Sequence, residues 1–207
     1  MVVGDPKIAR LLEHPAIWRG RSAAQRRSGL PTGFAALDEY LPDSGWPRTG
    51  LIEILVARFG SGELTLLMPA LAALTRAAVA RWCVWVAPPL VPFAPALASG
   101  GVVLDRVTVV GGERSLWAFE QALGSGACDA VLGWLRQVKP RDIRRLQLAA
   151  ERGRTLGMLF RPRRAAREAS AAVLRLSVEP LAAGVRLTIL KGRSARRDAL
   201  ELPWPGS

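Results

Sequence analysis

Apolar residues along the chain fall into short runs that alternate with longer stretches of helical periodicity. The short runs predict buried strands at 51–56, 82–87, 107–110, 129–135 and 155–160. Between them, apolar residues recur every three or four positions and predict helices at 63–80, 113–123 and 141–152. A short helix at 32–40, capped by Thr32, is expected to precede the first strand. Strands joined by helices imply crossover connections, so we expect an α/β fold with a mostly parallel sheet and helices on both faces.

The end of the chain has a different pattern. Residues 172–178 and 185–191 alternate apolar and polar side chains, and a turn-like segment with Pro180 and Gly184 separates them. This alternation predicts an antiparallel hairpin at the edge of the sheet. At the other end of the chain, we expect residues 1–30 to form a helical extension with a basic connector. Residues 31–207 are expected to form the core.

Composition limits the class of protein. Half of the 207 residues are hydrophobic, no apolar run is long enough to span a membrane, and the first ten residues do not resemble a secretion signal, so a cytoplasmic protein is expected. Cys83 and Cys128 lie in apolar runs and are expected to be buried thiols. His14 is the only histidine, so neither a metal site nor a catalytic thiol or hydroxyl paired with histidine is predicted.

Positive charge is concentrated in one part of the chain. The net charge is +12, and the segment 136–198 alone holds 17 Lys and Arg against 5 Asp and Glu. Nucleic acid is the first candidate for the partner of such a segment. Its densest clusters are Arg161, Arg163, Arg164 and Arg167, and Arg193, Arg196 and Arg197. The alternative explanation of this positive charge is a genome-wide codon bias that favours arginine, because the chain has only three lysines.

A glycine-containing loop follows the first strand and reads Gly60-Ser61-Gly62-Glu63-Leu64. Strand, glycine loop and helix in this order are the layout of a phosphate-binding loop, which needs a Lys for the phosphates and a Ser or Thr for magnesium. Glu63 stands in place of the Lys and Leu64 in place of the hydroxyl. A carboxylate at this point repels a triphosphate, so the loop is expected to be degenerate.

The chain resembles the RecA family in its order of segments. The resemblance rests on Thr32-Gly33-Phe34, Gly45 to Ile54, Trp82 to Val86 and Gly124 to Val131. It implies a RecA-like core in which the catalytic Glu of the ATPases falls at Pro89 and the magnesium Asp at Trp134. With the loop residues also missing, the chain is expected to have no ATPase activity, no catalytic residue and no cofactor.

A nearer resemblance is to ImuA-type proteins and their SulA relatives. Its residues are His14 to Gly20, Gly60 to Leu64, Gly133-Trp134-Leu135, Phe160-Arg161-Pro162 and Leu187 to Lys191. The ImuA resemblance implies a non-catalytic role in SOS-induced translesion synthesis, near the nucleoid, beside the polymerase-like ImuB and an error-prone polymerase III alpha-type subunit. The alternative is a SulA-like inhibitor of cell division that binds FtsZ. The basic segment favours the first of these, with weak and non-specific binding to DNA.

Two ends of the chain are candidate docking sites for a partner such as ImuB or RecA. Leu11, Leu12, Ile17 and Trp18 form an apolar stripe before the core. Trp204 lies between prolines near the carboxyl terminus, where an aromatic side chain can anchor a partner.

Overall fold

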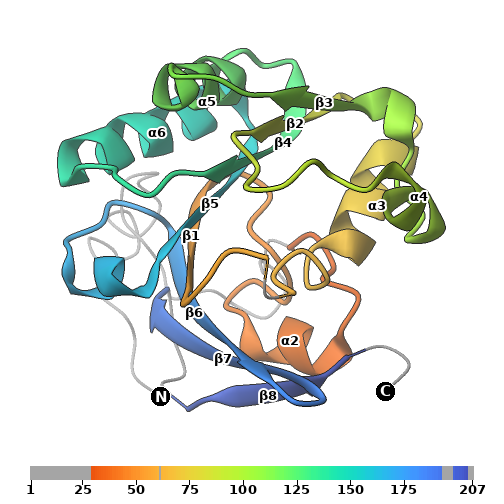
Figure 1. Ribbon diagram of the computed structural model, residues 1–207, viewed down its shortest axis with the longest axis vertical. Helices are drawn as coiled ribbons and strands as arrows, with labels where there is room; N and C mark the ends of the chain where they lie inside the picture. Colours follow the sequence, from red (N-terminus) through yellow and green to blue (C-terminus); the bar gives the residue numbers. More distant parts are fainter. Residues whose placement is uncertain (1–28, 61, 193–197, 205–207) are drawn as a thin grey trace, which may run out of the picture.

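A single mixed sheet runs through the molecule (Figure 1). The computed structural model describes residues 29–60, 62–192 and 198–204. Within these residues the strand order is β3-β2-β4-β5-β1-β6-β7-β8, parallel from β3 to β6 and antiparallel from β6 to β8. The strands are β1 Gly50–Val56, β2 Trp82–Val86, β3 Val107–Val110, β4 Cys128–Trp134, β5 Leu156–Pro162, β6 Leu174–Leu181, β7 Gly184–Lys191 and β8 Leu200–Pro203. The predicted α/β class and the antiparallel hairpin are confirmed.

Helices cover both faces of the sheet. They are α2 Ala35–Tyr40, α3 Met68–Arg76, α4 Ala94–Ser99, α5 Ser115–Gly124 and α6 Pro140–Gly153, with short 3-10 turns η2 Leu104–Arg106 and η3 Arg163–Arg167. Alternate residues of β1 point to opposite sides, so Ile52 and Ile54 join one apolar core with α2 and α3, while Leu51 joins a second core with α5 and α6. Every residue of β1 is buried, which makes this strand the centre of the domain.

Two predicted helices are too long. The helix expected at 63–80 spans only Met68–Arg76, because Pro69 is accepted in the first turn of a helix and not further in. The helix expected at 32–40 begins at Ala35, after the N-cap residue Phe34. Thr32 is therefore not its cap, although its hydroxyl accepts a hydrogen bond of 3.1 Å from the amide of Phe34.

Two elements were not predicted. Helix α4 lies in a segment for which no element was predicted, and β8 lies beyond the predicted hairpin. Leu202 of β8 is buried in the core, so residues 200–203 are part of the sheet.

A buried ionic network joins three strands at the middle of the sheet. Glu53 of β1 is fully buried, and its two carboxylate oxygens lie 2.8 Å from Nη1 of Arg161 on β5 and 2.7 Å from Nε of Arg175 on β6. Arg161 also binds Glu168 at 2.7 Å and the carbonyl of Val138 at 2.8 Å. Because both guanidinium groups are engaged inside the protein, the network stabilises the sheet only while all its members are present.

Arg161 therefore has a structural role. Its side chain is only 2% exposed, so it cannot reach a nucleic-acid phosphate, and its predicted place in the nucleic-acid cluster is wrong. Burial lowers its pKa, but hydrogen bonds to Glu53 and Glu168 outweigh burial and raise the pKa above the usual value. The residue thus stays charged and must keep its carboxylate partners. The sequence could not show this, because a buried arginine and an exposed arginine look alike in a basic run.

We expect the substitution Glu53→Ala to destabilise the fold by about 3–5 kcal/mol, because two buried guanidinium groups lose their shared partner. Urea unfolding followed by circular dichroism measures this loss. Glu201→Ala is the matched control, since Glu201 pairs with Arg186 at an exposed edge and its removal should leave the unfolding midpoint nearly unchanged. Equal midpoints for the two variants would show that the network does not hold the sheet together.

Candidate functional site

The degenerate loop lies where a phosphate-binding loop is expected, after the carboxyl end of β1. Gly60 and Gly62 have φ of +81° and +92°, the left-handed conformation that glycine adopts without strain. A series of turns at 63–67 separates the loop from α3. The amides of Thr65 and Met68 bond to carbonyls within this segment. The start of α3 is therefore separated from the loop by these turns, and its first amide is already paired, which removes the usual means of holding phosphate.

The side chain of Glu63 turns into its own loop. It is 2% exposed, and its Oε1 accepts a hydrogen bond of 2.8 Å from the amide of Gly60. An amide that would face a phosphate oxygen in a working loop thus faces a carboxylate oxygen of the protein. The carboxylate of Glu63 thus takes up the Gly60 amide and adds a negative charge that disfavours a nucleotide phosphate in this loop. Ser61 lies outside the described residues.

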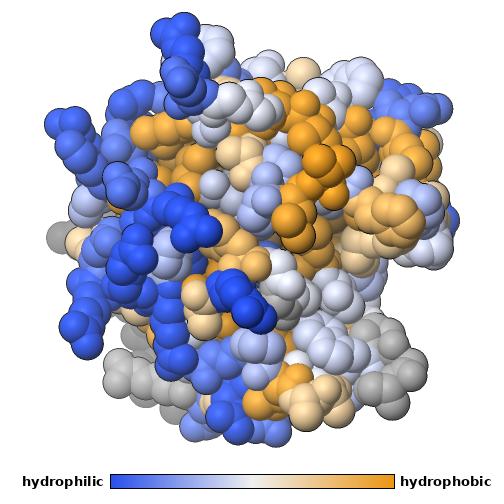
Figure 2. All heavy atoms as spheres, in the orientation of Figure 1, coloured by the Kyte–Doolittle hydropathy of each residue, from blue (hydrophilic) through white to orange (hydrophobic). Residues whose placement is uncertain are grey.

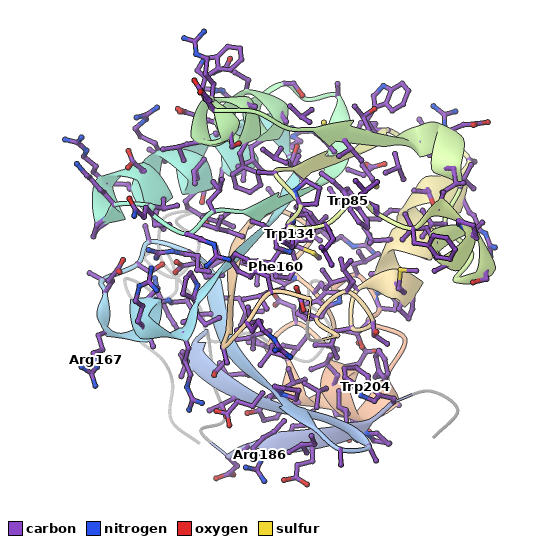
Figure 3. All side chains as sticks on the ribbon, in the orientation of Figure 1. Trp85, Trp134, Phe160, Arg167, Arg186 and Trp204 are labelled. Carbon is purple, nitrogen blue, oxygen red and sulfur yellow. The ribbon has the colours of Figure 1, made fainter. Side chains whose placement is uncertain are left out.

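Trp204 closes the loop from the carboxyl-terminal side. A Cβ placed on Gly62 would lie 2.8 Å from Cζ2 of the Trp204 ring, so the ring packs directly on the glycine backbone. The amide of Trp204 also donates to the carbonyl of Ala183 at 3.1 Å. Figure 3 shows Trp204 next to the end of the chain near α2. Trp204 is thus half-buried against the loop, and its predicted role as an anchor for a partner stays a prediction.

The two other positions at which an ATPase residue is missing are Trp134 and Pro89, and neither offers a carboxylate. Trp134 is buried at the end of β4, stacked on Phe160 with ring centroids 4.7 Å apart, and Trp85 lies 5.7 Å from it on the other side (Figure 3). This aromatic row crosses the three neighbouring strands β2, β4 and β5. It lies at the position where the RecA resemblance places the magnesium Asp of the ATPases. Pro89 is exposed and carries no acid. No chemistry of an ATPase can be assigned to these residues.

The two cysteines are buried free thiols, as predicted. Burial raises the pKa of Cys83 to about 12, with further contributions from Asp129 and Cys128. Burial also raises the pKa of Cys128. Both thiols are protonated at neutral pH and are therefore unsuited to act as nucleophiles.

Exposed basic residues gather on one side of the molecule. Figure 2 shows hydrophilic residues over the region of η3 and the start of α6, and Figure 3 shows Arg167 pointing away from the protein. The exposed members are Arg58, Arg136, Lys139, Arg141, Arg163, Arg164 and Arg167, and we call them the basic face. Arg163 pairs with Glu179 at 2.7 Å, so its charge is partly offset. The clusters predicted from the sequence did not include Arg58, which lies outside the basic segment, or Arg136, which is its first residue; the fold brings both to this face.

An apolar groove lies at the edge of the sheet that β3 forms. It has a volume of about 610 Å³, and its lining contains no charged residue. The lining is Ala87, Pro88, Leu90, Val91, Pro92, Ala94, Leu97, Leu104, Val107, Val109, Gly111 and Gly112. Leu90 is 73% exposed and Val91 is 93% exposed, and Figure 2 shows apolar side chains gathered over this part of the molecule. Residues 88–95, rich in proline and apolar side chains, were the sequence signal that could have revealed the groove.

Among the residues that the structure describes, no strand pairs with the outer edge of β3, the strand beside this groove. β3 reads Val-Thr-Val-Val, is the last strand of the sheet on this side, and carries no charge. Proteins protect exposed edge strands with charges or proline, as β8 does on the other edge with Glu201 and Pro203. An unprotected edge next to an exposed apolar groove is typical of a protein-binding surface.

Several predicted site residues lie outside the described residues. They are Leu11, Leu12, Ile17, Trp18, Arg193, Arg196 and Arg197. In the part of the chain that the structure describes, no helix is long and apolar enough to cross a membrane.

Comparison with known proteins finds similarity to proteins named cell division inhibitor SulA. The family model for cell division inhibitor SulA matches residues 50–157, from β1 to the start of β5. The SulA of Photorhabdus laumondii is 38% identical over 96 residues, which are 45% of this chain and 54% of that protein. The SulA of Edwardsiella piscicida is 32% identical over 120 residues, which are 56% of this chain and 70% of that protein. The chain thus spans about half the length of the first relative and more of the second.

A crystal structure of SulA from Pseudomonas aeruginosa is also similar. It is 26% identical, with a TM-score of 0.46, and the match covers 54% of this chain and 97% of the other. The helices and strands beyond residue 157, including η3 and β6 to β8, lie outside the segment that the family model matches.

These matches decide part of what the sequence predicted. The resemblance to the RecA and SulA group is confirmed at the level of SulA, and the resemblance to ImuA stays a prediction. Because the matched family is one of inhibitors, the prediction that the chain is not an enzyme is confirmed as well. The match over more than half of the chain shows that it belongs to the cell division inhibitor SulA family.

Proposed function

We propose that the protein is a non-catalytic, DNA-damage-induced inhibitor of cell division that binds a protein of the division machinery, with FtsZ as the target. Family membership supports this proposal, and so do the named relatives. Such a protein needs a binding surface and no reaction centre, which agrees with a loop whose amide faces Glu63.

The apolar groove is the observation that carries the proposal. It lies between residues 87 and 112, entirely inside the matched segment 50–157, whereas Arg163, Arg164 and Arg167 of the basic face lie outside it. An apolar groove beside an open strand edge offers a partner two kinds of contact: side chains fill the groove, and backbone amides and carbonyls extend the sheet. We propose that an extended apolar segment of FtsZ binds there.

A second candidate is the accessory role in translesion synthesis, beside ImuB and an error-prone polymerase. The basic face is the observation that favours it, because an inhibitor acting on FtsZ alone has no need of exposed cations. In this role the apolar groove would receive ImuB or RecA instead.

Replacing a groove residue should abolish division arrest. Overproduction of the protein in a bacterial host is expected to give long filaments, and Val109→Arg should restore normal cell length because it places a charge in the apolar groove. Leu148→Glu is the matched control. Leu148 is 54% exposed on α6 and does not line the groove, so this variant should still give filaments. Filaments from both variants would exclude the groove as the docking site.

Deleting the gene separates the two candidate functions. For a division inhibitor, we expect filamentation after ultraviolet damage to decrease while damage-induced mutation frequency is unchanged. Microscopy of cell length and counts of resistant colonies measure the two effects. A strong fall in mutation frequency with unchanged filamentation would contradict division inhibition and support the translesion role.

The sealed loop predicts that ATP and ADP do not bind. Calorimetric titration with magnesium-ATP should give no heat of binding, because the Lys and the hydroxyl are missing and Glu63 faces the amide of Gly60. Glu63→Ala should behave in the same way, since removing the carboxylate does not supply either missing group. A dissociation constant near 1 μM, about −8 kcal/mol, for the unmodified protein would contradict this prediction.

A further inference from the structure

A small cavity on the basic face is lined by three arginines. It has a volume of about 120 Å³ and opens at the carboxyl edge of the sheet, between the ends of β1 and β5. Its lining is Val56, Ala57, Arg58, Phe59, Arg136, Pro162 and Arg164. We call it the arginine pocket. The three guanidinium groups come from three segments that follow β1, β4 and β5, so the parallel sheet brings them together.

Among the described residues, no carboxylate lines the arginine pocket. The two nearest acids along the η3 to β6 segment are engaged elsewhere, Glu168 with the buried Arg161 and Glu179 with Arg163. Arg136 contacts a ring: its Cζ lies 5.0 Å from the centroid of Phe59. Positive charge is therefore concentrated around a concave space, which favours an anionic ligand.

Geometry narrows the ligand to a phosphate group. Guanidinium groups bind phosphate oxygens through paired hydrogen bonds. Pockets that enclose whole small-molecule ligands have volumes of about 300–1,000 Å³, so a space of about 120 Å³ suits one phosphate group and not a complete nucleotide. The cations outside the pocket, Lys139, Arg141 and Arg167, extend the positive surface, so the phosphate should belong to a longer polyanion.

We propose that the arginine pocket holds one phosphodiester group of a single-stranded nucleic acid, with the Phe59 ring holding the Arg136 guanidinium at the pocket. A single strand is favoured over a duplex because its flexible backbone can bend one phosphate into a concave pocket and follow the surrounding positive surface. The proposal goes beyond division inhibition and deepens the second candidate function, on whose basic face it rests. It replaces the buried Arg161 of the sequence-based cluster with Arg58 and Arg136, and it keeps Arg164.

The test is fluorescence anisotropy of a labelled oligothymidylate titrated with the full chain at several salt concentrations. The double variant Arg136→Ala/Arg164→Ala should bind about tenfold more weakly. Its salt dependence, the slope of log K against log salt, should become shallower by about 0.7, the value for one phosphate contact on a single strand. The matched control is Arg106→Ala/Arg114→Ala, which removes the same charge from exposed positions near β3 and should behave like the unmodified protein.

Two further measurements distinguish the sources of phosphate and the role of the ring. Phe59→Leu should weaken binding of oligothymidylate by less than the double variant does, because Arg136 loses the ring over which its guanidinium lies. If inorganic phosphate at 1 mM displaces the oligonucleotide, the pocket is a site for free phosphate and the proposal is overturned. Equal losses of affinity in the two double variants would also overturn it, because binding would then depend on total charge alone.

These outcomes are independent of the cellular function. Circular dichroism melting confirms that each variant is folded, which is expected because Arg136 and Arg164 are exposed. If the pocket variant loses oligonucleotide binding but cells show no change in mutagenesis, the translesion role fails and the pocket assignment stands. If mutagenesis depends on the gene but the pocket variant binds normally, the pocket assignment fails and the role stands.

Discussion

A carboxylate buried in the central strand is the constraint on which the rest of this structure depends. Glu53 lies in β1, whose seven residues are all buried, and such a charge is tolerable only when it is paired. Arg161 and Arg175 supply the pairing from the two strands that flank β1. Because Arg161 also binds Glu168 and the carbonyl of Val138, the same network holds the segment around η3 against the sheet. The network thereby fixes the position of η3, which carries the exposed arginines of the basic face.

Local patterns in the sequence were enough for most of the parallel sheet. The strands at 107–110 and 129–135 were expected almost where β3 and β4 lie, because short apolar runs between turn residues are typical of buried strands. The helix at 63–80 failed for a physical reason: Pro69 and the turns before it stop helical hydrogen bonding, whatever the apolar content. β8 could not be found, because four residues have no periodicity and become a strand only by pairing with β7.

The candidate site was only half predictable. The sequence alone shows which residues of a phosphate-binding loop are absent. The replacement of its Lys and its hydroxyl residue by Glu63 and Leu64 was therefore enough to predict a degenerate loop. What fills the loop depends on tertiary contacts: the packing of Trp204 on Gly62 joins residues far apart in the chain. The same limit applies to charge. A run of arginines gave no sign that Arg161 is buried, while Arg58 and Arg136 became neighbours only through the parallel strands.

Two surfaces of opposite character lie on the one sheet. The apolar groove lies beside β3, the first strand in the sheet order, and the arginine pocket lies between β1 and β5, with β2 and β4 in between. A protein partner in the groove therefore need not block the pocket. The aromatic row of Trp85, Trp134 and Phe160 packs β2, β4 and β5 together across this distance. Rings at the position where the RecA resemblance places a magnesium carboxylate thus give the sheet a continuous core between its two surfaces.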